Sequence, residues 1–279
     1  MKSMLTRNVK LYFKDKANVF FSMLSIIMII VLFALFLGQG NFGGTDIMNS
    51  WLMAGVLGVA AVTTSLGAFT VMVEDKVGKI TKGFYASPIK RSHIAASYIL
   101  SPFIVSVMMT VLTAIVFGLY IVATGGDLPA MAGIIQIAGL MLLSSIMATA
   151  MVCFIVSYIK TNSVFGTVSA ILGTLIGFLM GIYMPIGQLP GPIQIVIMLF
   201  PPSHAAMLYR RILMERPLEA AMTAAPYAMD WTRLKETLGV VFMFGDVEIA
   251  PVMSIVYMVV AAGVFFGLSL MNIRKPVSS

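Results

Sequence analysis

The sequence contains little cysteine, little histidine and little charge. Of 279 residues, one is cysteine, two are histidine and 10% are charged. The lone Cys153 cannot form an internal disulfide, which excludes a disulfide scaffold. Soluble domains usually carry about 25% charged residues, so the composition also excludes a soluble enzyme and a disordered chain.

Hydrophobic residues are abundant instead. They make up 59% of the chain, and the mean hydropathy is +1.00. A membrane-spanning helix needs about 20 apolar residues, and six segments without Asp, Glu, Lys, Arg or His approach or exceed that length. They are residues 20–37, 51–73, 98–123, 131–158, 164–183 and 249–271. We predict an all-α integral membrane protein with six transmembrane helices, in which residues 1–279 form a single domain.

The distribution of Lys and Arg predicts the orientation. Thirteen of the 18 basic residues lie in residues 1–19, in the loop 74–91, at Lys160 and after the sixth span, whereas the loops 39–50 and 124–130 have none. Because cytoplasmic loops collect Lys and Arg, both termini are expected in the cytoplasm and residues 184–248 outside. A bacterial plasma membrane is the expected location. The net charge of +7 is assigned to contacts with lipid headgroups, and not to nucleic acid.

Residues 1–19 are predicted to form an amphipathic helix in the membrane interface. Three apolar residues recur every four positions, and three basic residues lie on another face. The apolar side is expected in lipid and the cations on lipid phosphates. The apolar residues are Leu5, Val9 and Phe13, and the cations are Arg7, Lys10 and Lys14. The alternative is a basic flank that only fixes the topology.

The loop 74–91 is predicted to carry a short docking helix over Lys76–Phe84. Val77, Ile80 and Phe84 follow helical spacing, and the residue before Pro88 disfavours helix. We expect Phe84 to be the main anchor for a partner, because aromatic residues dominate interface energies. The predicted docking residues are Glu74, Asp75, Lys76, Val77, Gly78, Lys79, Ile80, Lys82, Phe84, Ser87, Pro88, Lys90 and Arg91. A solvated connector is the alternative interpretation.

The connection after the fifth span contains an apolar run, residues 193–200, with prolines on both sides. Eight residues are too few to cross a bilayer, so we predict a re-entrant or interfacial helix. Ser203 is expected to cap a following outside helix over 204–215, and residues 217–247 to form an outside subdomain. The candidates for an outer gate are Pro185, Leu189, Pro190, Pro201 and His204.

The sequence shows no motif for catalysis, for a metal or for a nucleotide. The stretch Val77–Thr81 does not complete a phosphate-binding loop, because Val73 stands where the first glycine would be needed and Ile80 stands where serine or threonine would be needed. His93 and His204 are predicted on opposite sides of the membrane, so they cannot share a site. No predicted span contains the ionisable residues that ion-driven carriers use. Energy for transport would therefore have to come from a docked partner.

Three features resemble the membrane subunit of type-2 ATP-binding-cassette (ABC) exporters, and the resemblance covers nearly the whole chain. The first is the loop from Glu74 through Gly78 to Ser87-Pro88 and Arg91. The second is the set of motifs after the fifth span: Pro185-x3-Leu189-Pro190, Leu199-Phe200-Pro201-Pro202-Ser203-His204 and Tyr209-Arg210-Arg211. The third is the six-span order with an amphipathic start.

The resemblance implies a half-transporter without enzyme activity or cofactor of its own. Two such permease subunits, identical or different, would line a pathway. Two separate ATPase subunits would bind ATP and Mg and would dock on the loop 74–91. The expected cargo is amphipathic: a drug, a lipid or a peptide. The alternatives are an energy-independent channel or scramblase, a structural membrane subunit, and a membrane enzyme or processing factor.

Overall fold

The structure of the protein is a computed structural model. It describes residues 1–17, 19, 20, 27, 31, 45–224, 230–245 and 247–273. The described part is helical apart from one hairpin of two-residue strands, β1 (Met243–Phe244) and β2 (Val247–Glu248). The predicted span 20–37 lies outside the described residues except for Phe20, Ile27 and Val31.

Five long apolar helices match five of the predicted spans. They are α3 (Thr45–Val77), α5 (Arg91–Ala123), α6 (Met131–Ser157), α7 (Asn162–Leu179) and α12 (Pro251–Ile273). Each is long and apolar enough to cross a membrane. α3 and α5 have 33 residues each, which is about 50 Å at 1.5 Å per residue. Because this exceeds the hydrocarbon thickness of about 30 Å, we expect these helices to tilt or to project beyond it.

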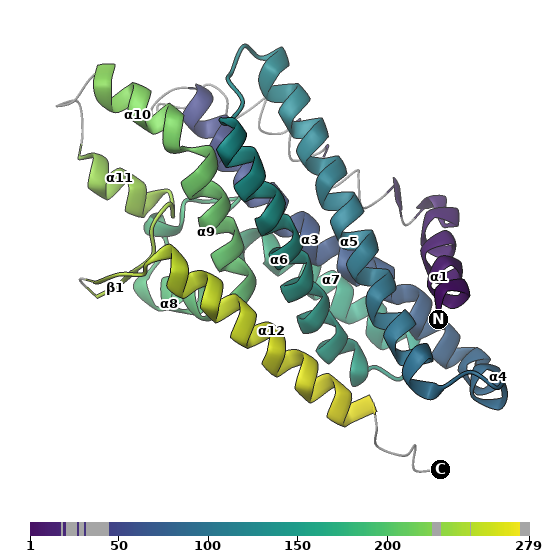
Figure 1. Cartoon of the computed structure of the whole chain (residues 1–279). Helices are drawn as coiled ribbons and strands as arrows, with labels where there is room; N and C mark the ends of the chain where they lie inside the picture. Colours follow the sequence, from purple (N-terminus) through teal and green to yellow (C-terminus); the bar gives the residue numbers. More distant parts are fainter. Residues whose placement is uncertain are drawn as a thin grey trace.

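α3 forms the centre of the molecule. It is the most buried of the five candidate spans, and it contacts α5, α6, α7 and α9 (Pro201–Leu213). Small residues let the backbones approach, as in other membrane helix pairs. A Cβ added to Gly58 of α3 would lie only 3.3 Å from the Cβ of Ala206 on α9. Figure 1 shows the long helices running obliquely side by side, with α12 along one flank of the bundle.

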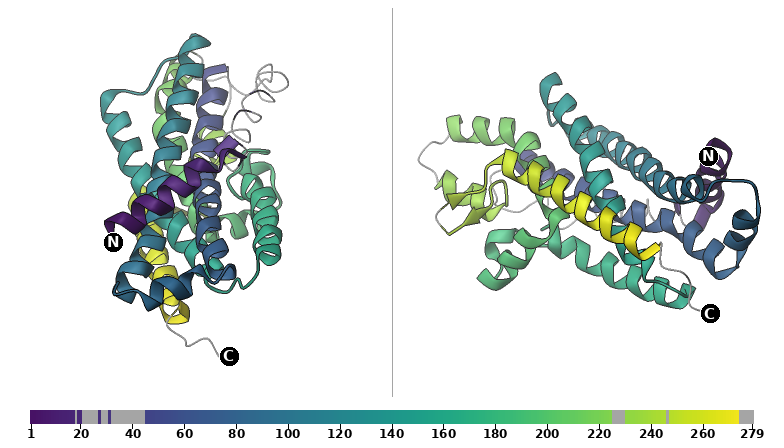
Figure 2. Two further views of the ribbon diagram at one scale, coloured as in Figure 1. Left: turned by 90° about the vertical axis from the view of Figure 1, so that its right-hand side faces the viewer. Right: turned by 60° about the horizontal axis from the view of Figure 1, so that its bottom comes forward.

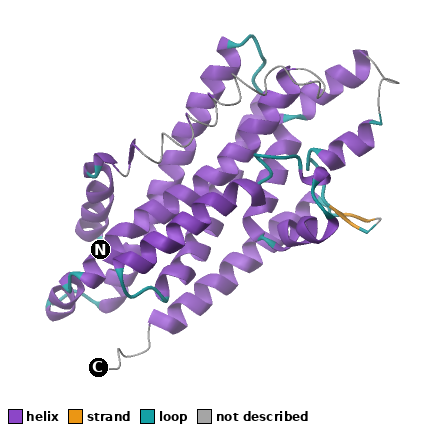
Figure 3. Cartoon of the chain, turned by 180° about the vertical axis from the view of Figure 1, so that it is seen from behind, coloured by secondary structure: helices purple, strands orange, loops and turns teal. Residues whose placement is uncertain are grey.

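The remaining elements gather at the two ends of the bundle. The α4 end holds α1 (Lys2–Lys14), which lies across α3 and α5, α4 (Ile80–Ala86) and the turn between α6 and α7. The α10 end holds α10 (Glu215–Ala224), α11 (Trp231–Thr237), the strand hairpin and the α5–α6 connection. The right-hand view in Figure 2 shows this separation. Figure 3 shows the hairpin, in orange, at the opposite end of the molecule from α1.

The apolar run after the fifth span forms a bent helix pair. After the 3-10 turn η2 (Ile186–Gln188), α8 (Gly191–Leu199) meets α9 at 95°, which would make a sixth candidate span or a re-entrant loop. α9 begins at Pro201 and Pro202, whose missing N–H groups suit a first helical turn. The prediction that Ser203 caps the next helix is therefore wrong, whereas the placement of this helix outside stays a prediction. The Ser203 hydroxyl donates to the Phe200 carbonyl at 2.7 Å, and α9 is buried against α3, α6 and α12.

Candidate functional site

The predicted helix Lys76–Phe84 is broken in the structure. α3 continues to Val77, and α4 begins at Ile80. Lys79, between them, has a φ of 59°, which is a left-handed conformation that an α-helix cannot include. Gly78 precedes it and weakens the helix by its low propensity. Val77 therefore lies on a different helix from Ile80 and Phe84.

An apolar pair remains exposed at this break. Val77 is 40% exposed and Ile80 is 46% exposed, and Lys79 and Lys82 are exposed beside them. We call these four residues the Val77–Ile80 patch. Other predicted docking residues of this loop are also exposed: Glu74, Gly78, Pro88, Lys90 and Arg91. The Lys76 side chain is engaged within the protein, because its ammonium donates a hydrogen bond to the Ile159 carbonyl at 2.9 Å.

Phe84 does not belong to the exposed surface. Its side chain is partly buried and packs on a cluster of Met4, Ile94 and Tyr98. The guanidinium carbon of Arg7 lies 5.3 Å from the centre of its ring, within the range of a cation–π contact. α1 therefore covers part of the ring, and the role of Phe84 as the anchor for a partner stays a prediction.

Asp75, a second predicted docking residue, is also buried, and it joins three helices. Arg7 of α1 holds its carboxylate with two hydrogen bonds of 2.6 and 2.9 Å. Tyr98 of α5 donates to the same carboxylate at 2.6 Å. Asp75 is only 3% exposed, and its hydrogen bonds to Arg7, together with its negative charge, raise the pKa of the Arg7 guanidinium. Arg7 therefore faces the protein, in contrast to the prediction that it lies on lipid phosphates.

α1 turns a mixed face toward the bundle. Met4, Asn8 and Tyr12 are its buried residues. Of the predicted apolar face, Leu5 and Val9 are partly buried and Phe13 is exposed. Lys10 and Lys14 are exposed. The placement of this helix in a membrane interface stays a prediction.

The outer-gate candidates divide into packed and exposed residues. Pro201 is buried as the first residue of α9, Pro185 and Leu189 are partly buried, and Pro190 is exposed. His204 is buried, and both ring nitrogens are occupied: Nδ1 lies 2.9 Å from the Ser254 hydroxyl and Nε2 lies 2.8 Å from the Met198 carbonyl. His204 is therefore a packed and hydrogen-bonded residue of the fold.

The sequence did not single out Arg210, which is the largest fully buried side chain. Its Nη2 donates to the carbonyls of Met180 and Gly181, at 2.5 and 3.1 Å. These carbonyls follow the C-terminus of α7, where a cation is favourable. The guanidinium carbon lies 5.4 Å from the ring of Trp51. Only the Tyr209-Arg210-Arg211 motif pointed to this region, and it does not distinguish Arg210 from Arg211.

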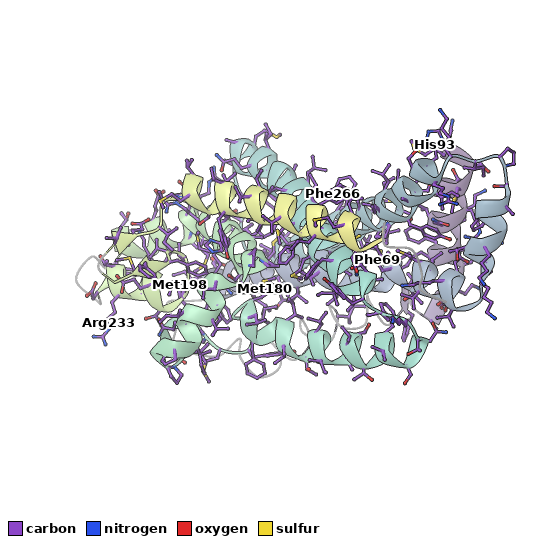
Figure 4. The ribbon with its side chains drawn as sticks, turned by 90° about the horizontal axis from the view of Figure 1, so that it is seen from below. Phe69, His93, Met180, Met198, Arg233 and Phe266 are labelled. Carbon is purple, nitrogen blue, oxygen red and sulfur yellow. The ribbon has the colours of Figure 1, made fainter. Side chains whose placement is uncertain are left out.

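The two histidines lie at opposite ends of the molecule. Figure 4 shows His93 at one end and Met198, the hydrogen-bond partner of His204, near the other. Within the described ranges, no three residues of His, Cys, Asp or Glu stand close enough to hold a metal ion.

A family model described as "ABC-2 family transporter protein" matches residues 41–271. A search of curated proteins found no match. The matched region includes α3 to α7, the bent pair and nearly all of α12. The chain therefore belongs to the ABC-2 family, as a multi-pass helical membrane domain of an ABC transporter.

Proposed function

We propose that the chain is the permease subunit of an ATP-driven exporter. Two permease subunits, identical or different, form the pathway, and two separate ATPase subunits bind ATP and Mg. Both termini and the α4 end face the cytoplasm. The loop charges support this orientation, since Lys and Arg concentrate at that end.

The observation that carries the proposal is the Val77–Ile80 patch. Exposed apolar side chains next to lysines suit a partner surface with a hydrophobic centre and an acidic rim. The patch lies directly after Asp75, which is bonded to α1 and α5. A push on the patch by an ATPase would therefore move α3, α1 and α5 together. This connection supports a coupling role for the segment.

The exposed face of α7 supports the second permease subunit. α7 is the least buried of the five candidate spans. Ile171, Leu175 and Phe178 are each about half exposed, at 52%, 49% and 53%. A second copy packed here would create a pathway with apolar walls. Such a pathway fits an amphipathic cargo: a drug, a lipid or a peptide.

The test removes the two exposed apolar side chains together, as Val77→Ala with Ile80→Ala. We expect the ATPase subunit to co-purify at least about tenfold less, because interface anchors typically contribute 2 kcal/mol or more. Membrane insertion should be unchanged, since neither side chain is buried in the bundle. The matched control is Ile135→Ala with Leu142→Ala on α6, which also removes two exposed apolar side chains, 66% and 49% exposed.

The outcome separates the candidate functions. Wild-type ATPase binding and wild-type export in the double variant, at equal membrane levels, would contradict docking at this patch. If no ATPase co-purifies with the wild-type chain, an energy-independent channel, a scramblase or a structural subunit becomes the better explanation.

A further inference from the structure

A groove opens on the side of the bundle between α6, α9 and α12, near the α10 end. Its volume is about 590 Å³, within the range of about 300–1,000 Å³ typical of small-molecule sites. Its lining includes Gln136, Gly139 and Leu143 of α6, Arg211 of α9, Glu215 of α10 and Ile255 of α12. Nothing in the proposed transport mechanism uses this groove.

The groove has an apolar part and a polar end. Gln136 lies in the second turn of α6, whereas Leu143 lies seven residues further along the helix, about 10 Å at 1.5 Å per residue. Arg211 and Glu215 flank the junction between α9 and α10. The groove therefore presents charged groups near the end of the bundle and hydrocarbon toward its middle, which matches a molecule with a polar head and an apolar tail.

The groove opens on a surface that faces lipid in a membrane. Ile135 and Leu142 of α6 and Val252 and Val256 of α12 are all about half exposed or more, and these helices are candidate spans. Lipid tails are as apolar as leucine. Filling the groove with an acyl chain therefore favours no particular lipid, and any selectivity has to come from the headgroup.

The charges at the polar end suit a headgroup with both signs. Arg211 Nη1 lies 2.9 Å from Glu248 Oε1 in a salt bridge. This contact uses one of the five N–H donors of the guanidinium. Glu215 has no ion pair among the residues that the structure describes. One adjoining hollow shares Arg211, Glu215 and Glu248 and adds Glu219 and Lys235. A second adjoining hollow shares Glu215 and adds Asp127 and Arg216. Four carboxylates thus stand beside three cations, which leaves one negative charge for a positive group to balance.

We propose that this groove binds a membrane phospholipid with an ethanolamine headgroup. The lipid phosphate accepts hydrogen bonds from the free donors of Arg211, and the primary ammonium donates to the Glu215 carboxylate. A choline headgroup has no N–H to donate, and a glycerol headgroup has no positive charge. The two acyl chains lie along α6 and α12, one of them in the groove beside Gly139. The inference requires only that the chain lies in a bilayer, and it does not depend on the cargo or on the ATPase.

The experiment measures which lipid the full chain retains. The chain is reconstituted into vesicles of phosphatidylethanolamine, phosphatidylcholine and phosphatidylglycerol in equal amounts, extracted in mild detergent, and its bound lipids are quantified by mass spectrometry. We expect phosphatidylethanolamine to be enriched about tenfold over phosphatidylcholine, as for one charge-assisted hydrogen bond. Glu215→Gln should bring this ratio close to one. Glu236→Gln, a carboxylate outside the groove, should leave it unchanged.

A second variant tests the position of the tail. A side chain added at Gly139 meets open space, so Gly139→Phe should fill the groove and remove the retained phospholipid. Gly263→Phe on α12 also meets open space but lies outside the lining, so it serves as the matched control. Retention by Gly139→Phe at the wild-type level would overturn the proposal. So would equal retention of the three lipids, or a preference for phosphatidylglycerol, in the wild-type chain. If Gly139→Phe does not fold, the lipid ratio of Glu215→Gln, a substitution at an exposed side chain, tests the proposal by itself.

Discussion

At the scale of single residues, burial separates neighbours that look alike in the sequence. Arg210 is fully buried, while the next residue, Arg211, is exposed and pairs with Glu248. Successive residues of a helix point about 100° apart, so only one of the two arginines can face α7. The buried one is closely surrounded: a Cβ on Gly55, Gly181 or Gly239 would stand within 3.5 Å of a guanidinium nitrogen.

Two glycines allow a test of this close fit. Gly239 and Gly245 both have a positive φ, 68° and 62°. A Cβ at Gly239 would lie 2.9 Å from Ile186 and 3.1 Å from Arg210, whereas at Gly245 it would meet nothing. Both alanine variants should lose about 1–2 kcal/mol from the left-handed backbone. Gly239→Ala should lose a further 1–3 kcal/mol, roughly the cost of overpacking.

The measurement is thermal unfolding of the purified chain in detergent, with Gly245→Ala as the control for backbone strain alone. Equal losses in the two variants would show that the Arg210 surroundings tolerate a methyl group.

At the scale of elements, long apolar runs define helices well, but short segments depend on their neighbours. The five described spans lie where their uncharged runs predict them. The segment 76–84 does not form the predicted single helix, because Lys79 takes a left-handed conformation and α4 turns Phe84 toward α1. Helical spacing predicted a common face for three residues, but it could not show the break at Gly78-Lys79.

The bent pair gives a prediction at this scale. In α8, Ile197 is fully buried, whereas Leu199 is 65% exposed. If α8 closes the outer end of a two-subunit pathway, Leu199→Cys should cross-link to its copy in the second subunit, and the yield should change when ATP is trapped. Ile197→Cys is the matched control and should not cross-link, because its side chain is buried in the core. Cross-linking would be measured on gels, with Cys153→Ser as the background. Equal yields at the two positions would contradict a defined contact between the two α8 helices.

At the scale of the whole molecule, the loops sort into two ends as their charges predict. Lys76 contacts Ile159 in the α6–α7 turn, so two basic connections share the α4 end. At the other end, a Cβ on Gly126 would lie 3.2 Å from the carboxylate of Asp46. Asp46, in the first turn of α3, therefore lies beside the α5–α6 connection, which has no Lys or Arg. This sorting supports the proposed orientation with both termini in the cytoplasm.

Cysteine labelling tests the orientation. With Cys153 replaced by serine, Asp127→Cys should react with an impermeant thiol reagent in whole cells. Lys82→Cys should react only after lysis. Both positions are exposed in the structure, so a difference in labelling would report the side of the membrane and not burial. Labelling of position 82 in intact cells would contradict the orientation.

The sequence by itself determined the class of protein, five of the spans and the grouping of the loops. These three properties can be read from the positions of apolar and charged residues along the chain, because an uncharged apolar run of about 20 residues favours a membrane-spanning helix. Only the tertiary structure decided which polar residues are buried. Asp75 and Arg210 are distinguished from the other charges by partners far away in the chain, Arg7 and Tyr98 for the first, Met180 and Gly181 for the second. A buried charge is stable only where such partners compensate its desolvation. The positions of those partners depend on helix packing, which no local pattern records.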